Sequence, residues 1–82
     1  MRLKIKMIKV RLLFTGYLKN KYLTDAIELN YKKPVRVHRI LRDAKISPAD
    51  VWIVKIGSSI VKEDYLLTRS SEIKLFPIIG GG

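Results

Sequence analysis

The residues whose types and spacing best suit a chemical role are the last seven, residues 76–82, with the sequence Phe-Pro-Ile-Ile-Gly-Gly-Gly. Glycine has no side chain to obstruct close approach, and a run of glycines makes a thin, flexible thread. The carboxylate of Gly82 is therefore the candidate reactive group, and Gly80 and Gly81 form the thread that would deliver it. By itself a glycine-rich end is more often an ordinary frayed terminus, so the rest of the sequence has to decide between these interpretations.

Few other reactive groups are available in the chain. The sequence contains no cysteine, which excludes disulfides, thiolate metal sites and a cysteine nucleophile. The single histidine, His38, falls among cations on the polar side of a predicted helix, so we assign it no ligand or catalytic role. Neither a phosphate-binding G-x-x-x-x-G-K-[S/T] loop nor a dinucleotide-binding glycine motif is present. We therefore expect no metal and no bound cofactor.

The length of 82 residues allows one small domain with a barely sufficient core. We expect this domain to span residues 1–77, followed by a flexible tail over residues 78–82. No apolar run approaches the roughly 18 residues of a membrane span, and charges interrupt the N-terminal stretch where a signal peptide would need an apolar run. The sequence therefore predicts a cytoplasmic protein that does not bind a membrane.

The net charge of +10 is the extreme feature of the composition. Residues 1–45 contain 13 basic and 3 acidic side chains, whereas residues 46–82 contain 4 of each. Such a surplus could attract nucleic acid, an anionic membrane surface or an acidic protein. A solvated basic face without a partner explains it at least as well.

Two strands are predicted in the first third of the chain. Residues 8–14 alternate apolar and polar side chains, as a half-buried strand does. Residues 1–6 alternate in the opposite phase, so they either extend this strand through a bulge near Met7 or lie outside it. Residues 15–21 are predicted as a loop and residues 23–31 as a second strand, and the short connection favours an antiparallel hairpin.

The clearest helix is predicted over residues 36–45. Val37, Ile40, Leu41 and Ala44 share one face, and charged residues occupy the other. The pair Arg39 and Asp43, four residues apart, has the spacing of a weak surface ion pair.

The second half of the chain contains mainly strands. A turn over residues 47–50 leads into residues 51–56, whose β-branched and aromatic side chains predict a well-buried strand. A turn at residues 57–59, a short return strand at 60–61, a short helical turn at 62–67 and a final strand at 72–76 complete the chain. One helix must then cover one face of a mixed four- to five-stranded sheet. If the first and last strands are neighbours, they run parallel. This α+β arrangement is the ubiquitin-like β-grasp.

Several segments also resemble a known family. They are residues 7–14 (MIKVRLLF), the helix that contains Ile40-Leu41, residues 47–51 (SPADV), residues 61–67 (VKEDYLL), residues 72–77 (EIKLFP) and the terminal Gly81-Gly82. Over residues 7–82 the chain resembles the ThiS/MoaD-type sulfur carriers, which have the ubiquitin-like β-grasp fold. Only the final strand with its Gly-Gly ending is specific to that family. The chain has Gly57-Ser58 where the family often has Asn-Gly, and Ser70-Ser71-Glu72 where it often has Gly-Asp-Glu. Both departures concern turns.

The resemblance implies a protein cosubstrate rather than an enzyme. In that family an E1-like adenylating enzyme activates the terminal glycine carboxylate with ATP. The acyl-adenylate then becomes a thiocarboxylate, which donates sulfur to a synthase in thiamine or molybdopterin biosynthesis or in tRNA thiolation. A terminal carboxylate with a pKa of about 3.5 is ionised and is a poor electrophile, so ATP and sulfur must come through partner enzymes. Residues 78–82 can extend to about 17 Å, which is enough to enter a partner's active site.

We expect the partner to dock on the sheet face that the helix leaves uncovered, close to the tail. An exposed apolar patch is the signature of such a surface. The candidates are Ile60, Leu75, Phe76, Ile78 and Ile79. When free, the protein is expected to be a monomer.

Two other functions stay open. A ubiquitin-like modifier would use the same Gly82 carboxylate to form an isopeptide bond with a lysine. A small basic nucleic-acid-binding module would use the N-terminal arm and the helix face with Arg36, Arg39 and Arg42, but no aromatic stacking platform accompanies these cations.

Overall fold

The computed structural model describes residues 7–78 of the chain. Residues 1–6, which we expected either to extend the first strand or to lie outside it, fall outside the described part. Within that part no helix is long and apolar enough to cross a membrane.

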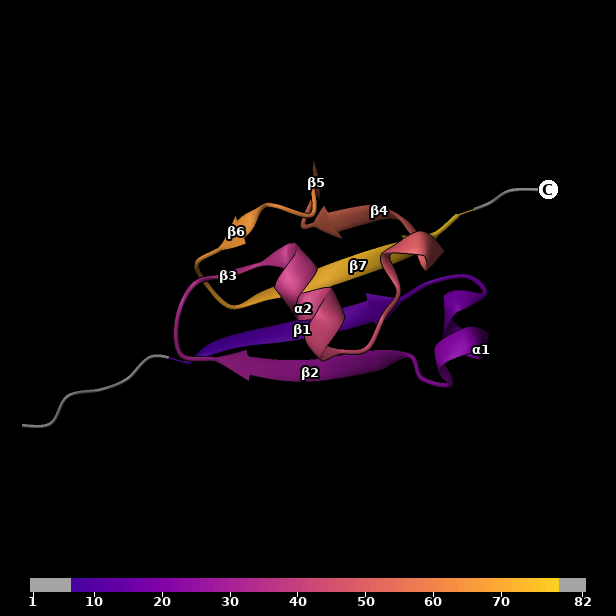
Figure 1. Ribbon diagram of the computed structural model, residues 1–82, viewed down its shortest axis with the longest axis horizontal. Helices are drawn as coiled ribbons and strands as arrows, with labels where there is room; N and C mark the ends of the chain where they lie inside the picture. The colour runs from indigo at the N-terminus through magenta and orange to yellow at the C-terminus, as the bar shows by residue number, and fades with distance from the viewer. Residues whose placement is uncertain (1–6, 79–82) are drawn as a thin grey trace, which may run out of the picture.

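A five-stranded mixed sheet is the main element of the fold (Figure 1). Its strands are β1 (Ile8–Phe14), β2 (Ala26–Tyr31), β4 (Val51–Ile56), β5 (Ser59–Val61) and β7 (Ser71–Pro77). Their spatial order is β2-β1-β7-β4-β5. β1 and β7 are parallel neighbours, whereas β1–β2, β4–β5 and β4–β7 are antiparallel. The predicted first hairpin and the predicted parallel pairing of the first and last strands are both confirmed.

One main helix, α2 (Val37–Asp43), covers one face of this sheet (Figure 1). Its buried residues are Val37, Ile40 and Leu41, as the apolar stripe predicted. The predicted two-layer α+β fold is therefore confirmed. Apolar side chains from the helix, the sheet and the connecting segments form a single core. Its buried members are Ile8, Val10, Leu12, Phe14, Leu18, Val35, Val37, Ile40, Leu41, Ile46, Val54, Leu67, Ile73 and Leu75.

α2 ends two residues earlier than predicted. Lys45 adopts a left-handed conformation with φ 61°, and its N–H donates to the carbonyl of Arg42. The next residue, Ile46, donates its N–H to the carbonyl of Leu41 and is itself buried. This pair of hydrogen bonds satisfies the last carbonyls of a helix, usually with glycine at the left-handed position. Because a lysine occupies that position here, the end of the helix could not be recognised from the sequence.

The prediction of a helical turn over residues 62–67 is wrong. This segment contains β6 (Leu66–Leu67), which pairs antiparallel with β3 (Val35–Arg36). The beginning of α2 explains the arrangement, because its first amides have no partner inside the helix and no side chain caps them. The N–H of Val37 donates to the carbonyl of Tyr65, and the N–H of His38 donates to that of Glu63. The turn and the residue that precede β6 thus cap the start of the helix with their carbonyls.

The predicted loop over residues 15–21 contains a helical turn, α1 (Leu18–Tyr22). Its Leu18 is fully buried, and the ring of Tyr22 lies edge-on to that of Phe14, with 5.5 Å between the centroids. Five residues are too few for a hydrophobic period to reveal a helix. This turn lies at the end of the molecule where β1 and β7 end (Figure 1).

Candidate functional site

The last described residues place the start of the tail at the centre of the sheet. β7 is hydrogen-bonded to a strand on each side and ends at Pro77, which is buried. Ile78 follows, with 44% of its surface exposed. Ile79 and the glycines Gly80, Gly81 and Gly82 lie outside the described residues, so their predicted roles stay predictions.

Backbone hydrogen bonds hold this end of β7 on two sides. The N–H and the hydroxyl of Thr15 both donate to the carbonyl of Leu75, at 3.2 and 2.8 Å. The N–H of Ile78 donates to the carbonyl of Asp50 at 3.3 Å. Asp50 is the last residue of the 3-10 turn η1 (Pro48–Asp50), which leads into β4. The chain therefore leaves the sheet between two fixed connections, the β1–α1 loop and η1.

The strand register defines which side chains lie on the face that α2 leaves open. On β7, Ile73 and Leu75 point into the core, so Phe76 lies on the open face together with its β4 neighbour Ile53. Further along this face, Lys74 neighbours Leu13 on one side and Lys55 on the other.

The same face continues to the edge of the sheet. On the edge strand β5, Ile60 neighbours Lys55 and is 66% exposed. The open face therefore has apolar side chains on four strands, with lysines between them.

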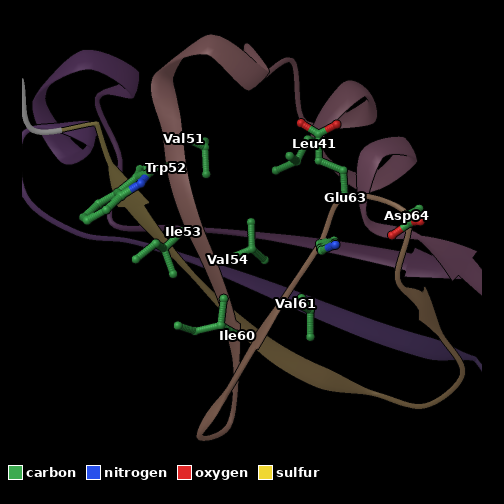
Figure 2. Close-up of a pocket in the computed structure, with 10 residues that line it drawn as sticks. Leu41, Val51, Trp52, Ile53, Val54, Ile60, Val61, Glu63 and Asp64 are labelled. Atoms are coloured by element: carbon green, nitrogen blue, oxygen red, sulfur yellow. The ribbon is translucent and has the colours of Figure 1, made fainter.

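A bulge in β4 adds a large aromatic side chain to the open face. The register between β4 and β7 shifts between Val51 and Ile53, which leaves Trp52 as the extra residue. A bulge of this kind redirects a side chain locally. Trp52 is 63% exposed, and Figure 2 shows it on the same side of β4 as Ile53 and Ile60. The predicted strand over residues 51–56 is confirmed as β4, but the expectation that it is well buried is wrong, since only Val54 is buried there.

An open groove of about 510 Å³ runs along the β4–β5 hairpin, and its lining includes Trp52, Ile53 and Ile60 of the open face (Figure 2). Val51, Val54 and Val61 of the same hairpin line it as well, together with Leu41 of α2. The rim includes Glu63. In residues 7–78 no polar or charged side chain is buried, and no cluster of His, Asp and Glu could hold a metal ion.

Some of the predicted docking residues are accessible in the structure, and one is buried. Ile60 and Ile78 are exposed and Phe76 is half-buried, so all three are accessible to a partner. The placement of Leu75 on the docking surface is wrong, because this side chain is fully buried under α2. Near the end of β7, both odd- and even-numbered positions are apolar. The alternation of the strand therefore could not show which of the two sets faces the helix.

Three residues of this face were missed, namely Leu13, Trp52 and Ile53. Leu13 could have been placed there from the sequence, because it lies between Leu12 and Phe14, which share the buried side of the strand. The positions of Trp52 and Ile53 depend on the strand register and on the bulge in β4, which are not visible in the sequence. The one available signal for them was that apolar residues occur at both odd and even positions of residues 51–56.

Two similar polar clusters occur outside the sheet faces. In the first, Asp50 accepts hydrogen bonds from Lys21 Nζ at 2.8 Å and from the Tyr22 hydroxyl at 2.5 Å. These bonds, first that of Lys21 and then that of Tyr22, lower the pKa of the Asp50 carboxyl.

In the second cluster, Asp43 accepts from the Tyr31 hydroxyl at 2.7 Å and pairs with Arg39 Nε at 3.4 Å. Burial, followed by the hydrogen bond to Asp43, raises the pKa of Tyr31. The predicted pair of Arg39 and Asp43 is confirmed.

Several solved structures of small proteins are similar to this chain. A Pyrococcus furiosus protein described as molybdopterin converting factor, subunit 1, superposes with a TM-score of 0.69 at 14% identity, covering 88% of this chain and 99% of its own. SAMP1, a small archaeal modifier protein from Haloferax volcanii, gives 0.68 at 12% identity, covering 90% and 99%. The HVO 2177 protein of the same organism gives 0.69 at 15%, covering 93% and 88%.

In sequence, no protein-family model matches the chain, and no curated protein matches it. The likeness to the solved structures therefore lies in the fold. With its mixed sheet, its parallel first and last strands and its single covering helix, the chain has the ubiquitin-like β-grasp fold that the ThiS/MoaD resemblance implied.

Proposed function

We propose that this protein is a sulfur carrier, whose C-terminal residue is Gly82 and whose terminal carboxylate is activated by a partner enzyme. The observation that carries the proposal is the position of the tail. The central strand β7 ends at Pro77 beside an exposed apolar face, and Gly82 follows five residues later. Two structural neighbours are named as a molybdopterin converting factor subunit and a small archaeal modifier protein, which supports a tail-based role.

The chemistry requires two steps on the partner side. An oxygen of the Gly82 carboxylate attacks the α-phosphorus of ATP, and pyrophosphate leaves. A sulfur nucleophile at the sulfide oxidation level, supplied by a donor enzyme, then attacks the carbonyl carbon, and AMP leaves. The product is a thiocarboxylate, which an acceptor synthase can use. This protein supplies the carboxylate and a docking face, and its partners supply ATP and sulfur.

The open face of the sheet is the proposed docking surface for the adenylating enzyme. Its apolar members are Leu13, Trp52, Ile53, Ile60, Phe76 and Ile78. Aromatic side chains such as Trp52 and Phe76 supply much of the affinity at protein interfaces. Because Phe76 and Ile78 belong to the strand end itself, docking on this face would bring the tail to the partner's active site.

A modifier function is the second candidate, because one neighbour is named as a modifier protein. In that case the activated carboxylate would pass to a lysine of another protein and form an isopeptide bond. Nucleic-acid binding is less favoured, since two of the three predicted arginines are engaged. Arg36 donates to the carbonyl of Asp64 at 2.7 Å, and Arg39 pairs with Asp43.

The test is adenylation by the E1-like enzyme of the same cell, measured as ATP–pyrophosphate exchange. We expect the full chain to support exchange, and a chain without Gly81-Gly82 to lose it while keeping the circular dichroism spectrum and melting temperature. A chain with one alanine added after Gly82 keeps every glycine but displaces the carboxylate, and it should also be inactive. Normal exchange by either variant would refute the proposal.

A further inference from the structure

Two segments far away in the sequence contact the end of β7. Gly16 lies against Pro77 in the β1–α1 loop. It has φ +58°, and a Cβ there would meet Pro77 Cγ at 3.0 Å. On the other side, the N–H of Ile78 bonds to the carbonyl of Asp50. The last described residues of the strand are thus held between this loop and η1.

Side chains of α1 hold η1 itself in place. The Tyr22 hydroxyl donates to the Asp50 carboxylate at 2.5 Å and accepts from the N–H of Ser47 at 3.0 Å. It therefore contacts both ends of η1. Lys21 adds a bond of 2.8 Å to the same carboxylate, whose side chain is 14% exposed. Asp50 is ionised at neutral pH, as an aspartate normally is, so its carboxylate can accept both bonds, and the two bonds in turn lower its pKa.

We propose that Tyr22, Asp50 and Gly16 are positioning residues, which fix the point and direction at which the chain leaves the sheet and thereby control delivery of the terminal carboxylate. This inference rests on the proposed function. Small errors in the placement of a reacting group can lower its rate by large factors. We therefore expect these residues to affect the turnover of the adenylation step, while the affinity for the partner depends on the open face.

The chain itself offers two matched controls. Tyr31 also donates its hydroxyl to an aspartate that pairs with a cation, but it connects β2 to α2. Gly57 also has a positive φ, +61°, but a Cβ there would meet nothing within 4 Å. Tyr31→Phe therefore removes the same kind of hydrogen bond as Tyr22→Phe. Likewise, Gly57→Ala introduces the same backbone strain as Gly16→Ala.

The experiment measures amide hydrogen exchange at Ile78 and steady-state adenylation for the four variants. We expect Tyr22→Phe and Gly16→Ala to speed exchange at Ile78 by about fivefold, the equivalent of one net hydrogen bond. They should lower kcat by roughly tenfold or more, with KM within about twofold of the wild-type value. Tyr31→Phe and Gly57→Ala should lower the melting temperature by similar amounts, but should leave exchange at Ile78 and kcat unchanged.

Equal effects within each matched pair, or a change in KM alone, would overturn the inference. If Tyr22→Phe does not fold, Asp50→Asn tests the same cluster, because it removes the carboxylate charge with little change of shape. Absence of adenylation by the wild-type protein would refute the proposed function, and with it the role of these residues in delivery. In that case, amide hydrogen exchange at Ile78 would still show whether Tyr22, Asp50 and Gly16 hold the end of the strand. Normal wild-type adenylation with no difference between the pairs would refute this inference alone.

Discussion

Leu75 and Phe76 are consecutive residues of β7, yet they belong to two different surfaces. The side chain of Leu75 is fully buried under α2 with Leu12, Ile40 and Ile73. That of Phe76 is half-buried and lies on the face that no helix covers. Since successive side chains of a strand point to opposite faces, one short segment contributes to both.

The comparison separates two uses of apolar surface. The covered face gathers nearly all fully buried side chains of the described residues, and it provides most of the hydrophobic stabilisation. The open face has fewer apolar residues, and two of them, Trp52 and Ile60, are mostly exposed. Exposed apolar side chains that gather on one face mark an interaction site. The covered face should thus determine stability, and the open face should determine recognition.

The largest expected effect is that of Leu41→Asp on the covered face. Leu41 is 1% exposed, and the described core contains no polar group that could pair with a carboxylate. We expect a loss of more than about 4 kcal/mol, which would unfold a domain of this size. Circular dichroism at 25 °C checks it. A cooperative thermal transition near that of the wild type would show that the covered face is misassigned.

Substitution of the two adjacent β7 residues tests the comparison directly. Leu75→Ala leaves a cavity in the core and should lower the free energy of unfolding by about 2–5 kcal/mol. Phe76→Ala removes a half-buried side chain and should cost roughly 1 kcal/mol. Urea unfolding of both variants measures the difference. An equal loss of unfolding free energy in the two variants would mean that the covered face does not contribute more to stability than the open face.

A smaller effect on stability, but a larger one on binding, is expected for Trp52→Ser and Ile60→Ser on the open face. Both side chains are mostly exposed, so each change should alter the free energy of unfolding by less than about 0.5 kcal/mol. Affinity for the adenylating enzyme should fall by about tenfold or more for Trp52→Ser. Titration calorimetry measures that affinity, and Arg69→Gln, a change at an exposed turn, is the control. Unchanged affinity in both serine variants would remove the open face from the proposed interface.

The smallest effect concerns alkaline pH and Tyr31, at the edge of the covered face. Its pKa is raised above the ordinary 10.0, first by burial and then by the bond to Asp43. The unfolded chain therefore loses this proton at a lower pH than the folded chain. The stability that the neutral hydroxyl provides is complete below about pH 10 and declines above it.

Tyr31→Phe should accordingly make the melting temperature less dependent on pH between about 9 and 11. The many lysines also titrate in this pH range, but they do so in both proteins. The difference in melting temperature between the variant and the wild type therefore reports on Tyr31. A steeper dependence in the variant would contradict the environment described for this hydroxyl.

Much of the fold could be predicted from the sequence, because its main signals are periodic. The alternation of residues 8–14 and 72–76 and the apolar stripe of α2 showed both strands and the helix. The order of the elements then required β1 and β7 to be parallel if they were neighbours, as they are. Periodicity did not reveal α1, which is a single turn, or β6, which has two residues and pairs with a strand far away in the sequence.

The site could be predicted less completely, for physical reasons. In β7 and β4, apolar residues occur at both odd- and even-numbered positions. Their pattern therefore does not indicate which face of the sheet the helix covers. The exposure of Trp52 depends on a bulge, which is a property of the register between β4 and β7. The cluster around Tyr22 and Asp50 joins residues 28 positions apart, and their spacing has no recognisable pattern.

The most direct test of the central claim is intact mass spectrometry of the protein purified from its own cells. We predict that the chain ends at Gly82 and that a fraction of it carries sulfur in place of one oxygen of the terminal carboxylate. Peptides of other proteins with Gly81-Gly82 branched onto a lysine would keep the Gly82 carboxylate as the working group but would assign the modifier function. A chain that continues beyond Gly82, or one that ends there with an unmodified carboxylate and no branched peptides, would contradict the account.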